Sequence, residues 1–250
     1  MMKRFIFSIF LLPLLLASPQ TKAQGIMLTP KWTAQAQFTG YYVADKLGFY
    51  KEEGIDVCVQ HPAISESSFS FMEKGRAPVV IMNLSYAFME RLAGARVVNV
   101  MQTSQENSLM LISHSPLKGE ESLRNQKIAV WNHLSQKLLD RLAEHYALKQ
   151  VEWIRFNSGV NVFLSGAADP CLVGSYNEYL QLSEYGMNVD SIYSIRLADY
   201  GYNLPEDGLY VTEEFYNQYP EVVRKLVKAS MRGWAWTNEH REEALDMVME

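Results

Sequence analysis

The sequence lacks the residue spacings that bind metals or build disulfide scaffolds. It has two cysteines, Cys58 and Cys171, among 250 residues, which excludes a small domain held together by disulfides. It contains no Cys-x-x-Cys pair and no His-Glu-x-x-His motif, and its five histidines are scattered. No metal site is therefore predicted. Each cysteine lies in a short apolar run, which fits either two buried thiols or one disulfide.

Basic residues are scarce outside the N-terminus. The first 22 residues contain three of the 23 lysines and arginines and no acidic residue. The rest of the chain therefore has 20 basic and 28 acidic residues, a net charge of −8. A body this acidic argues against nucleic acid as a partner and against binding to an anionic membrane surface.

Long apolar runs are also missing, except at the N-terminus. Met1–Arg4 is positively charged, Phe5–Ala17 is almost entirely apolar, and Thr21–Ala23 forms a small-residue cleavage pattern. Because the apolar run is too short to span a bilayer stably, residues 1–23 are predicted to be a signal peptide. The alternative is an uncleaved membrane anchor. No cysteine lies near the cleavage point, so we expect a periplasmic protein rather than a lipoprotein.

Short apolar runs alternate with helical patterns from residue 26 onward. Strands are predicted at residues 26–28, 55–60, 78–82, 97–101, 109–113, 127–131, 151–156, 171–173, 191–196 and 209–211. Helices are predicted at residues 40–51, 65–74, 84–93, 135–148, 158–165, 175–184 and 220–249. Strand–helix alternation with short connections is typical of α/β folds with mostly parallel sheets.

The pattern restarts after the polar segment 102–108, which predicts two lobes. We expect residues 24–104 to form the first lobe, residues 105–212 the second, and residues 213–250 a C-terminal helical segment. The last residues follow a helical pattern without a capping residue, as expected either of a natural end or of a truncated chain. Two α/β lobes joined by short crossovers favour a protein that binds its ligand in a cleft.

The stretch Lys31–Val57 is the most informative part of the chain. It begins at a strand end, continues through a loop rich in aromatic and amide side chains, and then enters a helix. Such a loop can stack on a flat ring and hydrogen-bond to its edge, and the start of the helix offers free N–H groups. The stretch reads Gln-Phe-Thr-Gly-Tyr-Tyr-Val-Ala, then Gly-Phe-Tyr, and ends in Gly-Ile-Asp-Val.

With these motifs the stretch resembles the first signature of the NMT1/THI5-like substrate-binding proteins of ABC transporters. Tyr176–Glu178 resembles the family's Tyr-Asn-Glu element, and Ser165–Pro170 resembles another family segment more loosely. Gly75–Pro78 stands where the family has a Gly-x-Ala-Asp turn, but lacks its acidic residue. The resemblance covers residues 28–237.

This resemblance implies a two-lobed fold of the type II periplasmic binding proteins. Each lobe would be a mostly parallel sheet flanked by helices, with the ligand in the cleft between the lobes. The implied ligand is a small heterocycle, most closely a thiamin pyrimidine precursor such as formylaminopyrimidine or hydroxymethylpyrimidine. The implied partner is an ABC transporter permease, and the protein would work as a monomer. Binding and hinge closure would be its whole mechanism, so we expect no cofactor.

Five candidate ligand-binding residues lie in the first lobe: Trp32, Gln37, Tyr41, Asn83 and Tyr86. Trp32 is either a stacking platform or a core aromatic, and Gln37 either faces the cleft or is a solvated loop residue. Tyr41 and Tyr42 point to different faces of a helix, so one of the two is expected to reach the cleft. Asn83 and Tyr86 follow a strand at its carboxyl end, where open α/β sheets bind ligands, although Asn83 also suits a helix cap.

Three further candidates, Tyr176, Asn177 and Glu178, lie in the second lobe. Glu178 would accept hydrogen bonds from the amino group and ring nitrogen of an aminopyrimidine. The alternative is an acidic residue in the first turn of a helix, favoured there without any ligand. Tyr176 and Asn177 would add a ring and an amide beside it.

Two other classes of function remain open. The resemblance extends to eukaryotic pyrimidine synthases that hold pyridoxal phosphate on a lysine and consume their own histidine. Counting back from Gly94 puts those positions near Met82 and Tyr86, neither of which can perform that chemistry. The third possibility is the extracytoplasmic sensor domain of a receptor.

Overall fold

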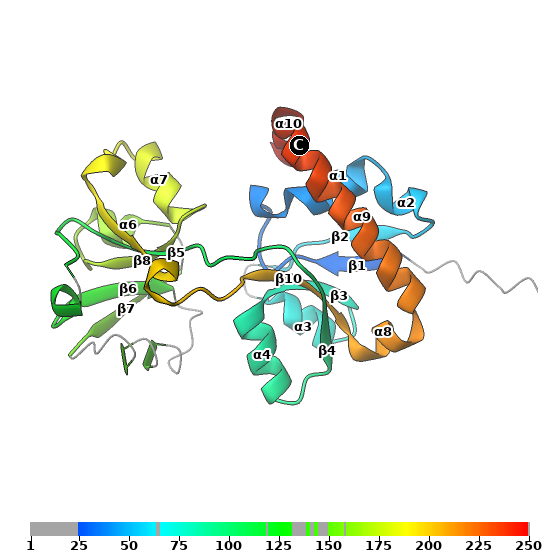
Figure 1. The fold of residues 1–250 in the computed structure, drawn as a ribbon, viewed down its shortest axis with the longest axis horizontal. Coiled ribbons are helices and arrows are strands. Elements are labelled where there is room, and N and C mark those ends of the chain that lie inside the picture. The colour runs from blue at the N-terminus through cyan, green and yellow to red at the C-terminus, as the bar shows by residue number, and fades with distance from the viewer. Residues whose placement is uncertain are drawn as a thin grey trace, which may run out of the picture.

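The structure, a computed structural model, consists of two α/β lobes joined by two crossover segments (Figure 1). It describes residues 25–63, 66–118, 120–131, 139–140, 143–144, 150–157 and 159–249. The predicted signal peptide, residues 1–23, and most of the helix predicted at residues 135–148 lie outside the described residues. None of the helices in the described part is long and apolar enough to cross a membrane.

The first lobe contains a five-stranded sheet in the order β2-β1-β3-β10-β4. Its strands are β1 (Ile26–Thr29), β2 (Val57–Val59), β3 (Val79–Asn83), β4 (Val97–Gln102) and β10 (Asp207–Thr212). β1 pairs in parallel with β2 and β3, whereas β10 runs antiparallel to both β3 and β4. Successive residues of β3 are all buried up to Met82, because helices cover both faces of this sheet.

The helices of the first lobe form two layers, one on each face of the sheet (Figure 1). They are α1 (Thr39–Lys46), α2 (Phe49–Glu52), α3 (Ser68–Glu73), α4 (Leu84–Leu92), α8 (Glu213–Gln218), α9 (Pro220–Glu239) and α10 (Arg241–Met249). Residues of α1 and α9 pack with Leu28, Ile81 and Leu209 in one core. Residues of α3 and α4 pack with Val80 and Met82 in the other.

The second lobe contains a five-stranded sheet in the order β7-β6-β8-β5-β9. Its elements are β5 (Leu109–Ser113), β6 (Lys127–Trp131), β7 (Glu152–Phe156), α6 (Asn161–Leu164), β8 (Cys171–Gly174), α7 (Glu178–Glu184) and β9 (Tyr193–Arg196). β6 is parallel to β7 and β8, and β5 is antiparallel to β8 and β9. The predicted two-lobed α/β fold is confirmed, but the pairing is mixed in both sheets rather than mostly parallel.

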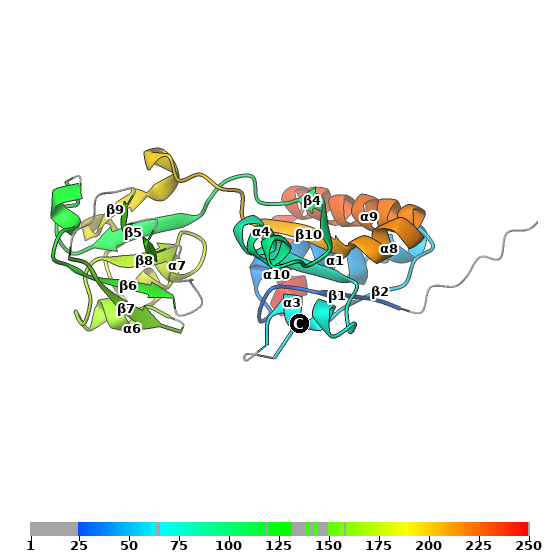
Figure 2. The same cartoon turned by 90° about the horizontal axis from the view of Figure 1, so that it is seen from below.

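The predicted boundary of the second lobe is wrong at its C-terminal end. Residues 207–212 form β10, which lies between β3 and β4 in the sheet of the first lobe. The sequence indicates a strand here but not its sheet, because an apolar run does not identify its neighbours. The chain therefore crosses between the lobes twice, after β4 and before β10, and Figure 2 shows the two crossovers running together. The second crossover was not predicted.

Two further predictions differ from the structure. Cys58 and Cys171 are free thiols, one exposed and one buried, and they belong to β2 and β8 in separate sheets. The disulfide alternative is therefore wrong. The helix predicted at residues 40–51 is divided into α1 and α2 at Gly48, whose φ of 75° is in the left-handed region that glycine adopts without strain.

α1 and α9 approach each other closely because both carry a glycine at the crossing point. A Cβ atom on Gly233 would lie 2.0 Å from the carbonyl oxygen of Gly40 and 2.8 Å from the Cβ of Ala44. A Cβ atom on Gly40 would lie 2.3 Å from the ring of Trp234. The contact thus leaves no room for a side chain, and it sets the position of the loop that precedes α1.

We expect Gly233→Ala to lower the free energy of unfolding by about 1–3 kcal/mol, the usual cost of forcing an extra methyl group into a packed contact. In an open helix the same change would instead stabilise the protein by about 1 kcal/mol. Denaturant unfolding measures the difference, and Asn238→Ala at an exposed position of α9 is the matched control. Equal stability of Gly233→Ala and wild type would contradict the close contact.

Candidate ligand-binding site

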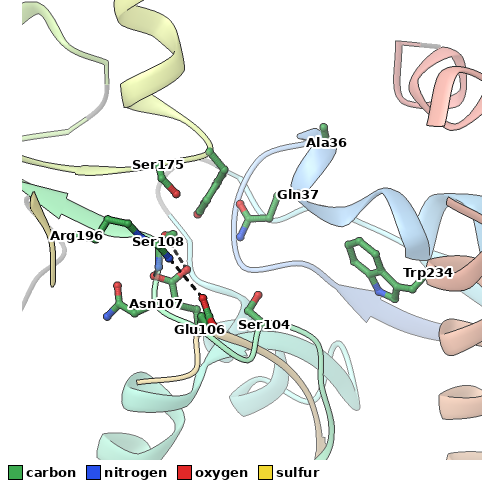
Figure 3. Close-up of a pocket in the computed structure, with 11 residues that line it drawn as sticks. Ala36, Gln37, Ser104, Glu106, Asn107, Ser108, Ser175, Arg196 and Trp234 are labelled. Atoms are coloured by element: carbon green, nitrogen blue, oxygen red, sulfur yellow. Dashed lines mark hydrogen bonds and ion pairs between the residues drawn. The ribbon is translucent and has the colours of Figure 1, made fainter. Parts of the chain in front are cut away.

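A pocket of about 400 Å³ lies between the lobes, within the range of roughly 300–1,000 Å³ that is usual for small-molecule sites. Its wall combines the loop before α1, both crossovers, the start of α7, the end of β9, and α9 (Figure 3). The lining residues are Ala36, Gln37, Ser104, Glu106, Asn107, Ser108, Ser175, Tyr176, Arg196, Glu206 and Trp234. Polar and charged side chains predominate, so the site can recognise hydrogen-bonding groups on a ligand.

Glu206 connects the two crossovers at the floor of this pocket. Its carboxylate accepts hydrogen bonds from the backbone N–H of Ser108 at 3.1 Å and from the Ser108 hydroxyl at 2.9 Å. Burial raises the pKa of Glu206, and the nearby charge of Lys31 opposes that rise. Within the described residues no ion pair with Glu206 is formed, so its negative charge has no direct cationic partner.

The neighbouring residue, Asp207, has in contrast a cationic partner. Its Oδ1 lies 2.8 Å from Nζ of Lys31, and its Oδ2 accepts a hydrogen bond from Nε2 of Gln37. Lys31 also donates to Oδ1 of Asn83 at 2.9 Å. These four residues, which we call the Asp207 cluster, join β10, the loop before α1 and the end of β3 behind the pocket wall.

Comparison with known proteins agrees with this arrangement. The model of the family described as NMT1/THI5 like matches residues 35–244. The chain belongs to this family. Among curated relatives, the riboflavin-binding protein RibY of Chloroflexus aurantiacus is 29% identical, over 92% of this chain and 67% of the relative. The formylaminopyrimidine-binding protein of Halalkalibacterium halodurans is 24% identical, over 99% of this chain and 79% of the relative.

More distant relatives and solved structures extend the comparison. A 4-amino-5-hydroxymethyl-2-methylpyrimidine phosphate synthase of Saccharomyces cerevisiae is 22% identical, over 79% of this chain and 62% of the enzyme. The periplasmic aliphatic sulphonate binding protein SsuA of Escherichia coli superimposes with a TM-score of 0.70 at 14% identity, over 90% of this chain and 77% of SsuA. This NMT1/THI5-like protein therefore shares the fold of the periplasmic binding proteins.

Two of the predicted site residues, Gln37 and Tyr176, line the pocket. They come from opposite lobes. Burial raises the pKa of the Tyr176 phenol, the carboxylates of Asp207, Glu206 and Glu178 raise it further, and the Gln37 side chain opposes the rise. Tyr176 is therefore a neutral hydroxyl at physiological pH, able to donate a hydrogen bond and to stack on a flat ring.

The other first-lobe candidates lie outside the pocket wall. Trp32 packs half-buried against the first-lobe core, with the Lys31 ammonium 4.5 Å from its ring centre. Tyr41 is 1% exposed and meets Trp234 edge to face, so it is a core residue. Asn83 contacts Lys31 rather than the pocket. Tyr86 is an exposed residue of α4 that packs against Phe69.

Glu178 is the main correction to the predicted site. It is 4% exposed, and its Oε1 accepts hydrogen bonds from Nε1 of Trp131 at 2.9 Å and Nδ2 of Asn177 at 3.2 Å. Its Oε2 accepts from the backbone N–H of Gly174 at 3.0 Å. Both oxygens are therefore occupied within the second lobe, and Asn177 is turned to Glu178 and Gln181. The pair fixes the start of α7 and thereby the position of Tyr176.

Sequence reasoning missed Glu206, Asp207, Ser108, Arg196 and Trp234. The signal that could have found the first two is an acidic pair directly before a buried strand, β10, since charged residues there need a partner or a ligand. Ser108 and Arg196 carry no such signal. They reach the pocket because the chain crosses between the lobes twice.

The loop that carries Gln37 is anchored by a half-buried histidine, His61. Nδ1 of His61 lies 2.5 Å from the carbonyl oxygen of Trp32, and Nε2 lies 2.7 Å from the hydroxyl of Tyr42. Because a carbonyl oxygen only accepts, Nδ1 carries the proton. Burial lowers the pKa of His61 from the ordinary value of 6.5, which favours the neutral imidazole, whose Nε2 accepts from the Tyr42 hydroxyl.

We expect Glu178→Gln to destabilise the second lobe rather than to act on a ligand. Loss of hydrogen bonds to a buried carboxylate costs about 1.5–3 kcal/mol. In the variant, the NH2 group of the new amide would also face at least one of the N–H groups that now donate to Glu178. Denaturant unfolding followed by tryptophan fluorescence measures this cost, since Trp131 is a direct partner. Glu184→Gln, at an exposed position of the same helix, should leave stability unchanged. A Glu178→Gln variant as stable as the control would contradict the assigned role.

We expect the stability of the protein to fall as the pH decreases through the ordinary pKa of His61 toward its lower folded-state pKa. The unfolded chain binds a proton to this histidine more readily than the folded chain does, so acid favours unfolding. The loss amounts to about 1.4 kcal/mol for each unit of pKa shift. His61→Asn keeps a donor for the Trp32 carbonyl and should show a shallower dependence between about pH 7.5 and pH 5.5. Equal slopes for wild type and variant would show that His61 does not cause the effect.

Proposed function

We propose that the chain is an exported substrate-binding protein that captures a small, flat nitrogen heterocycle and delivers it to the permease of an ABC importer. The observation that carries this proposal is the interlobe pocket, which is lined by the phenol of Tyr176 and by the carboxylate of Glu206, a group without an ion pair in the described part of the chain. Residues 1–23 would act as the signal peptide for export to the periplasm. The lobes would close on the ligand about the paired crossovers, without making or breaking a covalent bond.

The charges of the pocket favour a ligand with hydrogen-bond donors. Glu106 and Arg196 offset each other at 3.4 Å, and Asp207 is paired with Lys31, so Glu206 determines the net charge of the site. A carboxylate of raised pKa strongly favours an amine or ring N–H and disfavours an anion such as a sulfonate. We therefore propose a thiamin pyrimidine precursor, formylaminopyrimidine or hydroxymethylpyrimidine, in agreement with the ligand after which one relative is named.

A second candidate, riboflavin, is favoured by two specific observations. The pocket volume of about 400 Å³ leaves space beyond a single pyrimidine ring, and the relative at 29% identity is named for riboflavin binding. The imide edge of a flavin also presents an N–H donor. The same carboxylate and phenol would then contact a larger ring system.

A synthase activity is disfavoured by the side chains at the positions that the family resemblance assigns to its lysine and histidine. Met82 is 1% exposed in the core of the first lobe, and Tyr86 lies on the outer surface of α4. Neither can form an imine with pyridoxal phosphate or supply an imidazole. An export signal is also inconsistent with a cytosolic synthase.

The test is calorimetric titration with 4-amino-5-hydroxymethyl-2-methylpyrimidine, formylaminopyrimidine, riboflavin and ethanesulfonate. We expect binding of one of the pyrimidines, and a loss of about tenfold or more in affinity for Glu206→Gln, which corresponds to at least one charge-assisted hydrogen bond. Glu214→Gln, at an exposed position of α8, is the matched control. Binding of riboflavin alone would establish the second candidate, and preferential binding of ethanesulfonate would overturn the proposed ligand class.

A further inference from the structure

Gln37 is the pocket residue whose orientation the structure constrains most. It lies on the loop between β1 and α1, in the wall of the pocket (Figure 3). Its amide has two different ends, an NH2 group that only donates and a carbonyl oxygen that only accepts. Which end faces the ligand determines which ligands fit.

The Asp207 cluster determines that orientation. Lys31 lies 2.8 Å from Oδ1 of Asp207, and the two side chains are 14% and 7% exposed. In this ion pair the carboxylate oxygens of Asp207 serve as hydrogen-bond acceptors. The NH2 group of Gln37 therefore has to face Oδ2 of Asp207. The reverse orientation would place two acceptors against each other.

This arrangement leaves the carbonyl oxygen of Gln37 without a partner. Oε1 is buried and, among the described residues, no group forms a hydrogen bond with it. A buried acceptor without a donor is costly, and Gln37 lines the pocket, so a ligand N–H group would relieve that cost. A sulfonate, phosphate or carboxylate presents only acceptors and would add a repulsive contact.

We infer that Gln37 is a specificity-determining residue whose carbonyl oxygen accepts a hydrogen bond from an N–H group of the ligand, and that Asp207 and Lys31 are its positioning residues. The inference rests on the proposed function, since it takes the pocket as the ligand site. It narrows the ligand class to heterocycles that carry an exocyclic amino, amide or ring N–H group on the edge facing the first lobe. Glu206 then contacts the ligand from the crossover side.

The orientation of Gln37 is tested on the ligand-free wild-type protein. In the 15N spectrum, the side-chain amide of Gln37 is assigned by its loss in Gln37→Met. We expect its NH2 protons to exchange with solvent more slowly than those of Gln35, which lies on the same loop outside the pocket wall. Exchange as fast as that of Gln35 would overturn the proposed orientation.

The contact with the ligand is tested by a cycle of two proteins and two ligands. Wild type and Gln37→Met are titrated with 4-amino-5-hydroxymethyl-2-methylpyrimidine and with its 4-dimethylamino analogue, which lacks the amino donors. We expect Gln37→Met to weaken binding of the amino compound by about tenfold. The weaker binding of the dimethylamino analogue should change by less than about twofold. Gln35→Met should alter neither affinity.

The outcomes separate this inference from the proposed function. An equal loss for both ligands in Gln37→Met would overturn the donor assignment while leaving the pocket as the binding site. If wild type binds neither pyrimidine, the ligand proposed above is wrong. The cycle is then run with riboflavin and 3-methylriboflavin, which lacks the imide N–H. Equal losses in that cycle would likewise overturn the assignment.

Discussion

The side chain and the backbone of Asp207 together tie the binding site to the fold. Its carboxylate pairs with Lys31 and accepts from Gln37, and its carbonyl oxygen accepts from the backbone N–H groups of Thr103 and Ser104 at 3.0 Å. The residue therefore connects the loop between β1 and α1, the first crossover and β10. A buried ion pair contributes little net stability, since desolvation of the two charges offsets their attraction. What it supplies here is a fixed geometry.

The paired crossovers, which form the proposed hinge, also line the pocket. The two crossovers are joined by backbone hydrogen bonds between Ser104, Glu206 and Asp207, and by the contacts between Glu206 and Ser108. Under the proposed function, a ligand that binds Glu206 would act directly on the segment about which the lobes would rotate. Differential affinity for the closed arrangement is what drives such a rotation. Ligand contacts at the crossovers would then couple binding to closure without a separate signalling element.

The sequence predicts the local elements well and their assembly less well. Strands such as Leu109–Ser113 and Lys127–Trp131 are predicted at their observed bounds, because short apolar runs between turn residues have few alternatives. The sheet to which β10 belongs depends on contacts with residues more than 100 positions away, which a local pattern does not encode. The same limit applies to the pocket. Gln37 and Tyr176 lie in recognisable motifs, whereas Glu206 and Ser108 meet only because the chain crosses twice.

The comparison of Glu178 with Glu206 shows which property separates a structural carboxylate from a ligand-binding one. Glu178 is buried and Glu206 half-buried, both precede or begin an element, and both have at least two hydrogen-bond donors. Glu178 is enclosed by donors from three positions of its own lobe and is not among the residues that line the interlobe pocket, whereas both oxygens of Glu206 share one residue, Ser108, at the pocket wall. A carboxylate accepts up to about four hydrogen bonds, so Glu206 keeps acceptor capacity on the side that faces the pocket. Free hydrogen-bond acceptor capacity on the side that faces the pocket therefore distinguishes the acidic residue of the proposed site. Burial and membership of a motif do not.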